Sequence, residues 1–175
     1  MNKRLLFCVE TNHQSETDDL YIRETIKRFY EDNKKVTYRT YFLKTKTRYK
    51  SRATTNAISE FYSNSAKENT HIIFFIDTDN YDVDPEAKKL LDEIRDYCNR
   101  KGYELVLFCR DVEDVYWGRQ VSGTEKTKMA KDFKKAKRIS SVREDFLRKT
   151  VPTIHSSNIL TVLDKFFIKK DKGIE

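Results

Sequence analysis

Three carboxylates in this sequence follow short apolar runs. Glu10 ends the run LLFCVE, and Asp77 and Asp79 end the run IIFFIDTD. A buried strand does not tolerate unpaired carboxylates, so we expect these acids at strand ends, where solvent, a metal ion or a basic partner compensates their charge. If the two strands are neighbours, the three acids converge, and like charges that close repel unless a cation lies among them. The pattern therefore predicts a site of oxygen ligands for magnesium or manganese.

The segments that must position these acids alternate between two kinds. Apolar and β-branched runs predict four strands, at 5–10, 35–45, 71–77 and 103–109. Apolar residues at helical spacing predict helices between them, within 11–33, 54–66 and 85–102. This order indicates an α/β fold with a mainly parallel four-stranded sheet and helices on both faces, of the Rossmann-like kind. In such sheets ligands bind outside the carboxyl ends of the strands.

The last third of the chain has a different pattern. Residues 119–140 are polar and rich in lysine, which predicts a long loop or a marginal helix. The stretch SNILTVLDKFFIKK at 157–170 predicts a Ser-capped C-terminal helix with one apolar face. We therefore expect an α/β core at 1–118, and a basic, helical extension at 119–175 that packs on the same domain.

Composition indicates which class of partner the protein binds and in which cellular compartment it is found. The 175 residues include 35 Lys and Arg against 28 Asp and Glu, a net charge of +7, which favours an acidic or phosphate-bearing partner unless it serves solubility alone. The three cysteines, Cys8, Cys98 and Cys109, are separated and lie beside apolar residues, which indicates reduced core packing. The first apolar run is too short for a signal peptide, and no run is long enough for a membrane span. We expect a cytoplasmic protein without a membrane.

Two basic stretches are candidates for contact with nucleic acid. Residues 34–52 contain no acid and interleave cations with tyrosines, and 124–143 form a second Lys-rich stretch. Cations pair with phosphates and exposed rings stack on bases, so the pattern favours DNA or RNA, although a solvated strand edge would look similar. The candidate residues are Lys44, Lys46, Arg48, Lys50, Arg52, Lys134, Lys135, Lys137 and Arg138.

The strand-end acids and their order resemble the TOPRIM domain, the catalytic module of topoisomerases, bacterial-type primases and the OLD and RloB-like nucleases of phage defence. Glu10 matches that family's strand-end glutamate, and Asp77 and Asp79 match its D-x-D. The phrase CVETNHQSETDDLYI looks most like the RloB-like opening, in which Glu16 would be a further metal ligand. The stretch DVEDVYWG offers Glu113, four residues before a tryptophan, for the acid that this group carries after its fourth strand.

The resemblance implies a magnesium- or manganese-dependent hydrolysis of phosphodiester bonds in DNA or RNA. Asp77 and Asp79 would hold one or two ions that activate a water molecule, and Glu10 would complete the metal site or act as general acid/base. His13, in the loop after Glu10, is a further candidate ligand or proton shuttle. A separate ATPase chain or a homo-oligomer is the kind of assembly that this resemblance suggests.

Two other functions remain open from the sequence. A haloacid-dehalogenase-like phosphatase also has an apolar strand that ends in D-x-D, and Asp77 would then be its nucleophile. That family's nucleophile strand normally opens the fold, whereas here a long stretch precedes it. A non-catalytic module that binds nucleic acid or a partner protein is the other alternative, because Thr11 stands where many TOPRIM domains have glycine.

Overall fold

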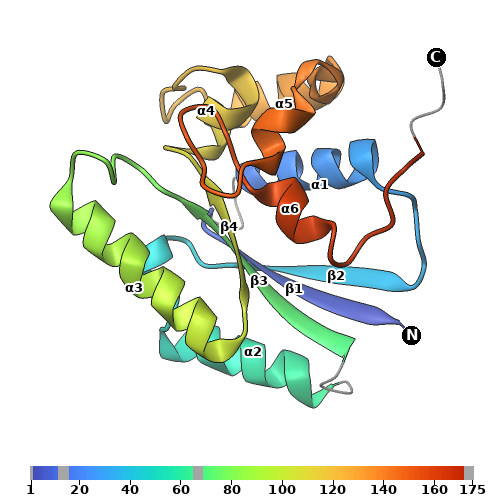
Figure 1. Cartoon of the computed structure of the whole chain (residues 1–175), viewed down its shortest axis with the longest axis vertical. Helices are drawn as coiled ribbons and strands as arrows, with labels where there is room; N and C mark the ends of the chain where they lie inside the picture. Colours follow the sequence, from blue (N-terminus) through green and yellow to red (C-terminus); the bar gives the residue numbers. More distant parts are fainter. Residues whose placement is uncertain (1, 12–15, 65–68, 172–175) are drawn as a thin grey trace.

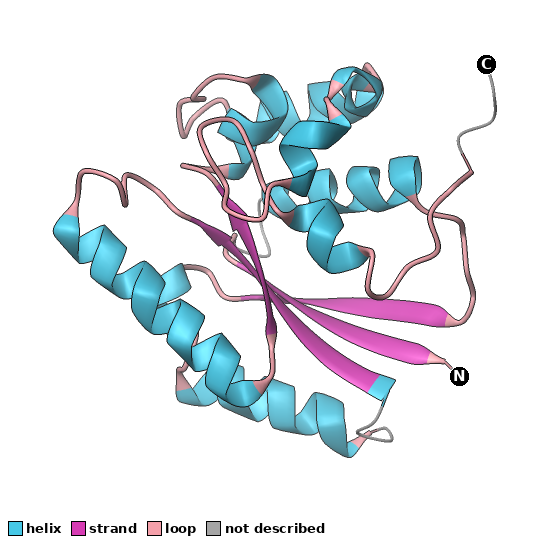
Figure 2. Ribbon diagram, viewed as in Figure 1, coloured by secondary structure: helices cyan, strands magenta, loops and turns pink. Residues whose placement is uncertain are grey.

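The chain, described here from a computed structural model, forms an α/β fold around one four-stranded parallel sheet (Figures 1 and 2). The structure describes residues 2–11, 16–64 and 69–171. The strands lie in the order β2-β1-β3-β4, and every neighbouring pair is parallel. Their bounds are β1 Lys3–Val9, β2 Val36–Phe42, β3 Thr70–Asp77 and β4 Glu104–Phe108. The α/β class and the parallel sheet predicted from the sequence are confirmed.

Helices cover both faces of the sheet, as Figure 1 shows. Successive side chains of a strand point to opposite faces, so each strand contributes to two cores. Phe7 and Phe75 pack in one core with the first helix and the C-terminal helices, whereas Cys8 and Phe74 pack in the other with the second and third helices. The helices of the first core are α1 Thr17–Phe29, α4 Val112–Trp117, α5 Lys126–Lys135 and α6 Ile159–Leu163. The helices of the second core are α2 Arg52–Ser63 and α3 Pro85–Lys101.

The helix of the second layer that follows β3 begins and ends as its sequence predicts. The side chain of Asp84 accepts hydrogen bonds from the backbone N–H groups of Glu86 and Ala87, and Pro85 occupies the first turn. Gly102 ends the helix in the left-handed region, with φ +68°. These local signals fix where the chain leaves the acidic end of β3 and turns back along the sheet.

The last third of the chain contributes to the first core. The Lys-rich stretch forms α5, whose Ala130 and Phe133 are buried against α1. Three short 3-10 helices complete the elements of the described chain, at Lys46–Arg48, Arg138–Ser141 and Glu144–Arg148. The expected helix is shorter than predicted, because α6 spans five residues. Asn158 precedes it without a side-chain cap, but the Oγ atom of Ser157 accepts a hydrogen bond from the backbone N–H of Ile159 at 3.1 Å. The apolar residues of the expected helix nevertheless lie in the core, because the turns after Leu163 still bury Phe166 and Phe167.

The segment before α6 covers the outer edge of β4. The side-chain oxygen of Asn158 accepts a hydrogen bond from the backbone N–H of Leu107 at 2.7 Å, and its amide group donates to the carbonyl of Leu105 at 2.9 Å. The backbone N–H of Cys109 donates to the carbonyl of Ser156 at 3.0 Å. One side-chain amide therefore satisfies a donor and an acceptor that a neighbouring strand would otherwise engage.

Two further expectations concern the described part of the chain. Cys8, Cys98 and Cys109 are all buried and free, as predicted for reduced core packing. Within residues 2–11, 16–64 and 69–171, no helix is both long and apolar enough to cross a lipid bilayer.

Candidate acidic site at the carboxyl edge of the sheet

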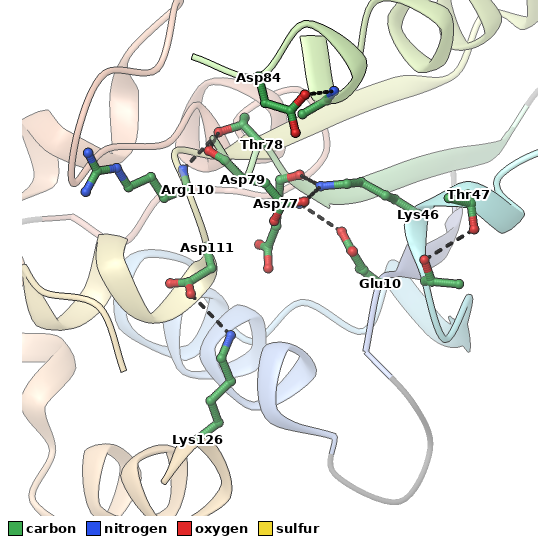
Figure 3. A network of polar contacts seen from close by, with 12 residues as sticks. Glu10, Lys46, Thr47, Asp77, Thr78, Asp79, Asp84, Arg110, Asp111 and Lys126 are labelled. Carbon is green, nitrogen blue, oxygen red and sulfur yellow. Dashed lines mark hydrogen bonds and ion pairs between the residues drawn. The ribbon is translucent and has the colours of Figure 1, made fainter. Parts of the chain in front are cut away.

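The carboxyl ends of β1 and β3 lie at the point where the strand order reverses. The chain passes from β1 outward to β2 on one side, and β3 then returns to the other side of β1. Ligands in open α/β sheets bind at this kind of switch point. Glu10 follows β1 and Asp77 ends β3, and Glu10 Oε2 accepts a hydrogen bond from the backbone N–H of Asp77 at 3.1 Å (Figure 3). The structure thus brings these two predicted residues together.

A cavity of about 340 Å³ opens between these strand ends, the start of α1 and the start of α5. Three carboxylic acids line it, Glu10, Asp18 and Asp77, together with the two cations Lys44 and Lys126. The sequence did not single out Asp18 or Lys126. Asp18 stands in the first turn of α1, within the acid-rich stretch that followed Glu10. Its neighbouring acids in that stretch gave no reason to choose it before the helix was placed.

Burial, together with the charges of neighbouring acids, raises the pKa of all three acids of this cavity. Burial, followed by the charge of Glu113, raises the pKa of Asp18 to about 7. Burial, followed by the charges of Asp18 and Glu10, raises the pKa of Asp77 well above its ordinary value. Burial also raises the pKa of Glu10, against the lowering effect of Lys46. Added positive charge here would favour the ionised forms of all three groups.

Asp77 has an oxygen that nothing in the described chain satisfies. Its Oδ1 atom is buried and accepts no hydrogen bond from the described residues. The carboxylate of Asp18, in contrast, has a hydrogen-bond donor, because Thr17 Oγ1 donates to Asp18 Oδ1 at 3.0 Å. A buried carboxylate oxygen without a donor is costly, and a bound cation or a proton removes that cost.

Lys126 lines the cavity and pairs with two further acids, Glu113 and Asp111. Its Nζ atom lies 2.7 Å from Glu113 Oε2 and 3.2 Å from Asp111 Oδ2, the second of which is drawn in Figure 3. Glu113 is fully buried and its Oε1 has no hydrogen-bond partner in the described chain, while Asp111 also caps α4. Burial lowers the pKa of Lys126, but Glu113 and Asp111 outweigh burial and raise it. Glu113, predicted as a metal ligand, is therefore already paired with a lysine.

Asp79 is turned toward a different cation. The Nζ atom of Lys46 forms an ion pair with Asp79 Oδ2 and donates to the backbone carbonyl of Asp77 at 2.6 Å (Figure 3). Asp79 has φ +51°, and its carboxylate is half exposed. The left-handed backbone re-aims the side chain after the strand ends. The D-x-D motif thus places one acid in the cavity and the other against Lys46.

Two other candidates of the first loop lie apart from this cavity or outside the described residues. Glu16 precedes α1 in the left-handed region, with φ +47°, and lines a neighbouring groove between α1, β2 and α5. It is not among the residues that line the acidic cavity. His13 falls in the range 12–15, outside the described residues.

The first basic stretch does not form one exposed track. The side chain of Lys46 is 9% exposed and engaged with Asp79. Lys50 lies 3.8 Å from Glu93 and over the ring of Tyr49, on the layer opposite the cavity. Lys44 is exposed and lines the acidic cavity. The remaining predicted cations of this stretch are Arg48, the last residue of the short 3-10 helix, and Arg52, the first residue of α2.

The second basic stretch presents its cations more openly. Lys134 and Lys135 end α5 and are exposed, and Lys137 follows them with φ +51°. Arg138 lies with its guanidinium 4.3 Å from the ring centroid of Trp117. This stretch therefore contains exposed cations and one that is engaged by an aromatic ring.

The acids fit a hard divalent cation in part. Glu10, Asp18 and Asp77 supply carboxylate oxygens, and the buried, unpartnered Oδ1 of Asp77 is the feature that a cation would satisfy. Within the part of the chain that the structure describes, however, no group of three or more His, Cys, Asp or Glu side chains is assembled closely enough to hold one ion. Binding would have to draw the three carboxylates inward.

Comparison of the chain with protein-family models, with curated proteins and with solved structures finds no match.

Proposed function

We propose that this protein is a metal-dependent phosphodiester hydrolase of the TOPRIM type that acts on nucleic acid. The observation that supports it is the meeting of Glu10, Asp18 and Asp77 in one cavity at the β1/β3 switch point. Buried acids that raise one another's pKa in a cleft are typical of functional sites. The net charge of +7 favours a phosphate-bearing substrate.

Each residue of the acidic cavity has a role in the proposed hydrolysis. Asp77, with Asp18 and Glu10, would hold magnesium or manganese, which supplies Lewis-acid stabilisation of phosphate charge and a more acidic bound water. Glu10 would complete this metal site or, if it does not bind the metal, act as general acid/base from the same strand end. Lys44 and Lys126 line the same cavity and attract the phosphate. Asp79 takes part only after it leaves Lys46.

A non-catalytic module that binds nucleic acid is the second candidate. The ion pairs of Lys46 with Asp79 and of Lys126 with Glu113 favour it, because they already neutralise two of the predicted ligands. The phosphatase alternative has less support. Its nucleophile would be Asp77, but that family's nucleophile strand normally opens the fold, whereas Asp77 ends the third strand in chain order, β3.

Metal titration separates these candidates. Magnesium and manganese are titrated by calorimetry into the parent protein, Asp77→Asn and the matched control Asp82→Asn, whose side chain is exposed outside the cavity. Cleavage of labelled DNA and RNA is followed in parallel. We expect the parent and Asp82→Asn to bind an ion and cleave, and Asp77→Asn to do neither. Nucleic-acid binding without ion binding or cleavage in the parent would establish the second candidate instead.

A further inference from the structure

A second and larger cavity, of about 570 Å³, lies between α1, the edge strand β2 and α5. Its walls come from two helix faces. Arg23 and Lys27 are four residues apart on α1, and Thr127, Lys131 and Lys134 follow one another at helical spacing on α5. We call this cavity the α1/α5 groove. It carries no role in the chemistry proposed above.

The α1/α5 groove holds uncompensated positive charge. Arg23 pairs with Asp19 on its own helix, and Lys27 pairs with Glu24. Lys131 and Lys134 are exposed and have no ion-pair or hydrogen-bond partner within the described residues. Five cations line the groove against three acids, Glu16, Asp19 and Glu24. Asp19 and Glu24 pair with cations of their own helix, so Lys131 and Lys134 leave a place for anions.

The groove adjoins the acidic cavity. Thr127 lines both, and Lys126, the residue before it, reaches the carboxylates. With a helical rise of 1.5 Å per residue, Lys131 and Lys134 lie about 6 and about 10 Å along the α5 axis from Thr127. A strand whose scissile phosphate sits at the acids would therefore place its next phosphates beside these two lysines.

The groove offers little for reading bases. The ring of Tyr38 is stacked on Phe7, with centroids 4.9 Å apart and planes inclined by 13°, and the guanidinium of Arg23 lies 5.3 Å from the Tyr38 centroid. Both faces of this ring are covered, so a base cannot stack there. The cations of the groove contact the phosphate backbone, and such contacts carry no sequence information.

We propose that the α1/α5 groove binds the backbone of a single nucleic-acid strand and leads it into the acidic cavity. The direction of the strand rests on the proposed function, but the binding itself does not. The volume is within the range of a site for a small ligand, and it accommodates one or two nucleotides of a strand. Binding is independent of sequence and weakens steeply with salt.

Fluorescence anisotropy with labelled 12-nucleotide DNA and RNA strands of mixed sequence, in EDTA, tests the proposal. The variant is Lys131→Gln/Lys134→Gln, and the matched control is Lys88→Gln/Lys89→Gln, two exposed lysines on α3 in the opposite layer. We expect the groove variant to weaken binding at least tenfold at low salt, and to reduce the slope of log K against log salt by about 1.4, from two phosphate contacts at about 0.7 each. The control should change neither quantity.

The outcomes separate the groove from the proposed catalysis. Equal losses in both variants, or tighter binding of a matched duplex than of the single strand, would overturn the groove proposal. Preference between the DNA and RNA strands then assigns the natural polymer. If lysine-dependent strand binding is found while the parent neither binds metal nor cleaves, the groove stands and the hydrolase proposal fails. If the groove variant still binds strands fully while metal-dependent cleavage is intact, the groove proposal fails alone.

Discussion

Glu10 Oε2 and the backbone N–H of Asp77, 3.1 Å apart, join the end of β1 to the end of β3 by a side chain. Glu10 therefore has two roles, a hydrogen bond that joins the strand ends and a negative charge that a metal ion can bind. Substitution separates them, because glutamine keeps an oxygen acceptor and loses the charge, whereas alanine loses both.

Glu10→Gln is therefore expected to be at least as stable as the parent in EDTA, and Glu10→Ala to be less stable by about 1–2 kcal/mol. Both variants should lose affinity for manganese. Urea unfolding at pH 7.5 and calorimetry measure the two effects. Equal destabilisation by both substitutions would mean that the bond contributes nothing to folding.

The stability of the metal-free protein should depend on pH through Asp18. Its pKa of about 7 in the folded chain exceeds that of an unfolded aspartate, so the folded state binds the proton more tightly. This contribution is fully present below about pH 4 and is lost as the pH rises to about 7. The free energy of unfolding falls by up to about 1.4 kcal/mol per pH unit for this one group.

Urea midpoints at pH 5 and pH 7.5, in EDTA, test this dependence in the parent, in Asp18→Asn and in Asp132→Asn, an exposed control on α5. We expect Asp18→Asn to gain stability relative to the parent at pH 7.5 more than at pH 5, and Asp132→Asn to follow the parent. An Asp18→Asn curve parallel to that of the parent would contradict the expectation.

Lys126→Met should destabilise the protein by about 3–5 kcal/mol at pH 7.5, because it leaves the fully buried Glu113 without its cation. Adding Glu113→Gln should recover much of that loss, since no buried charge then remains at this position. Lys128→Met, on the exposed side of α5, should change stability by less than about 0.5 kcal/mol. Urea unfolding of the parent, Lys126→Met, Glu113→Gln and the double variant gives the coupling energy, and a coupling near zero would show that the ion pair is not formed.

Lys46→Met tests whether this lysine serves the fold or a nucleic-acid surface. The side chain donates to the carbonyl of Asp77 and pairs with Asp79, so its loss should cost about 1.5–3 kcal/mol of stability. Strand affinity in EDTA should remain unchanged. Lys44→Met, whose exposed side chain lines the acidic cavity, should leave stability unchanged. Weaker strand binding by Lys46→Met at full stability would reverse the assignment.

The sequence predicted the sheet well because each strand is a short, nearly continuous apolar run that can be recognised without knowledge of the tertiary structure. Runs such as HIIFFID are buried on both faces, and the capped helix after them is punctuated by Pro85 and Gly102. Strand ends are also local features, so Glu10 and Asp77 could be placed at one edge before the fold was seen. Whether those two strands are neighbours is a tertiary fact, which the order β2-β1-β3-β4 supplies.

The missed residues of the acidic cavity lack such a signal. Asp18 is one acid among several in its stretch, and only the first turn of α1 decides which of them faces the strands. Lys126 is one lysine among many in a segment whose helix has few apolar residues, so its periodicity is weak. The pairing of Asp79 with Lys46 depends on a left-handed backbone at Asp79, which no spacing rule foresees.

The amide of Asn158 has a consequence for self-association. By filling hydrogen-bonding positions at the outer edge of β4, it leaves β2 as the edge at which the described sheet can accept another strand. A dimer built by strand addition would then pair β2 with its own copy, and two-fold symmetry makes that pairing antiparallel. The α1/α5 groove borders the same strand, so such a dimer would bring two grooves to one continuous sheet.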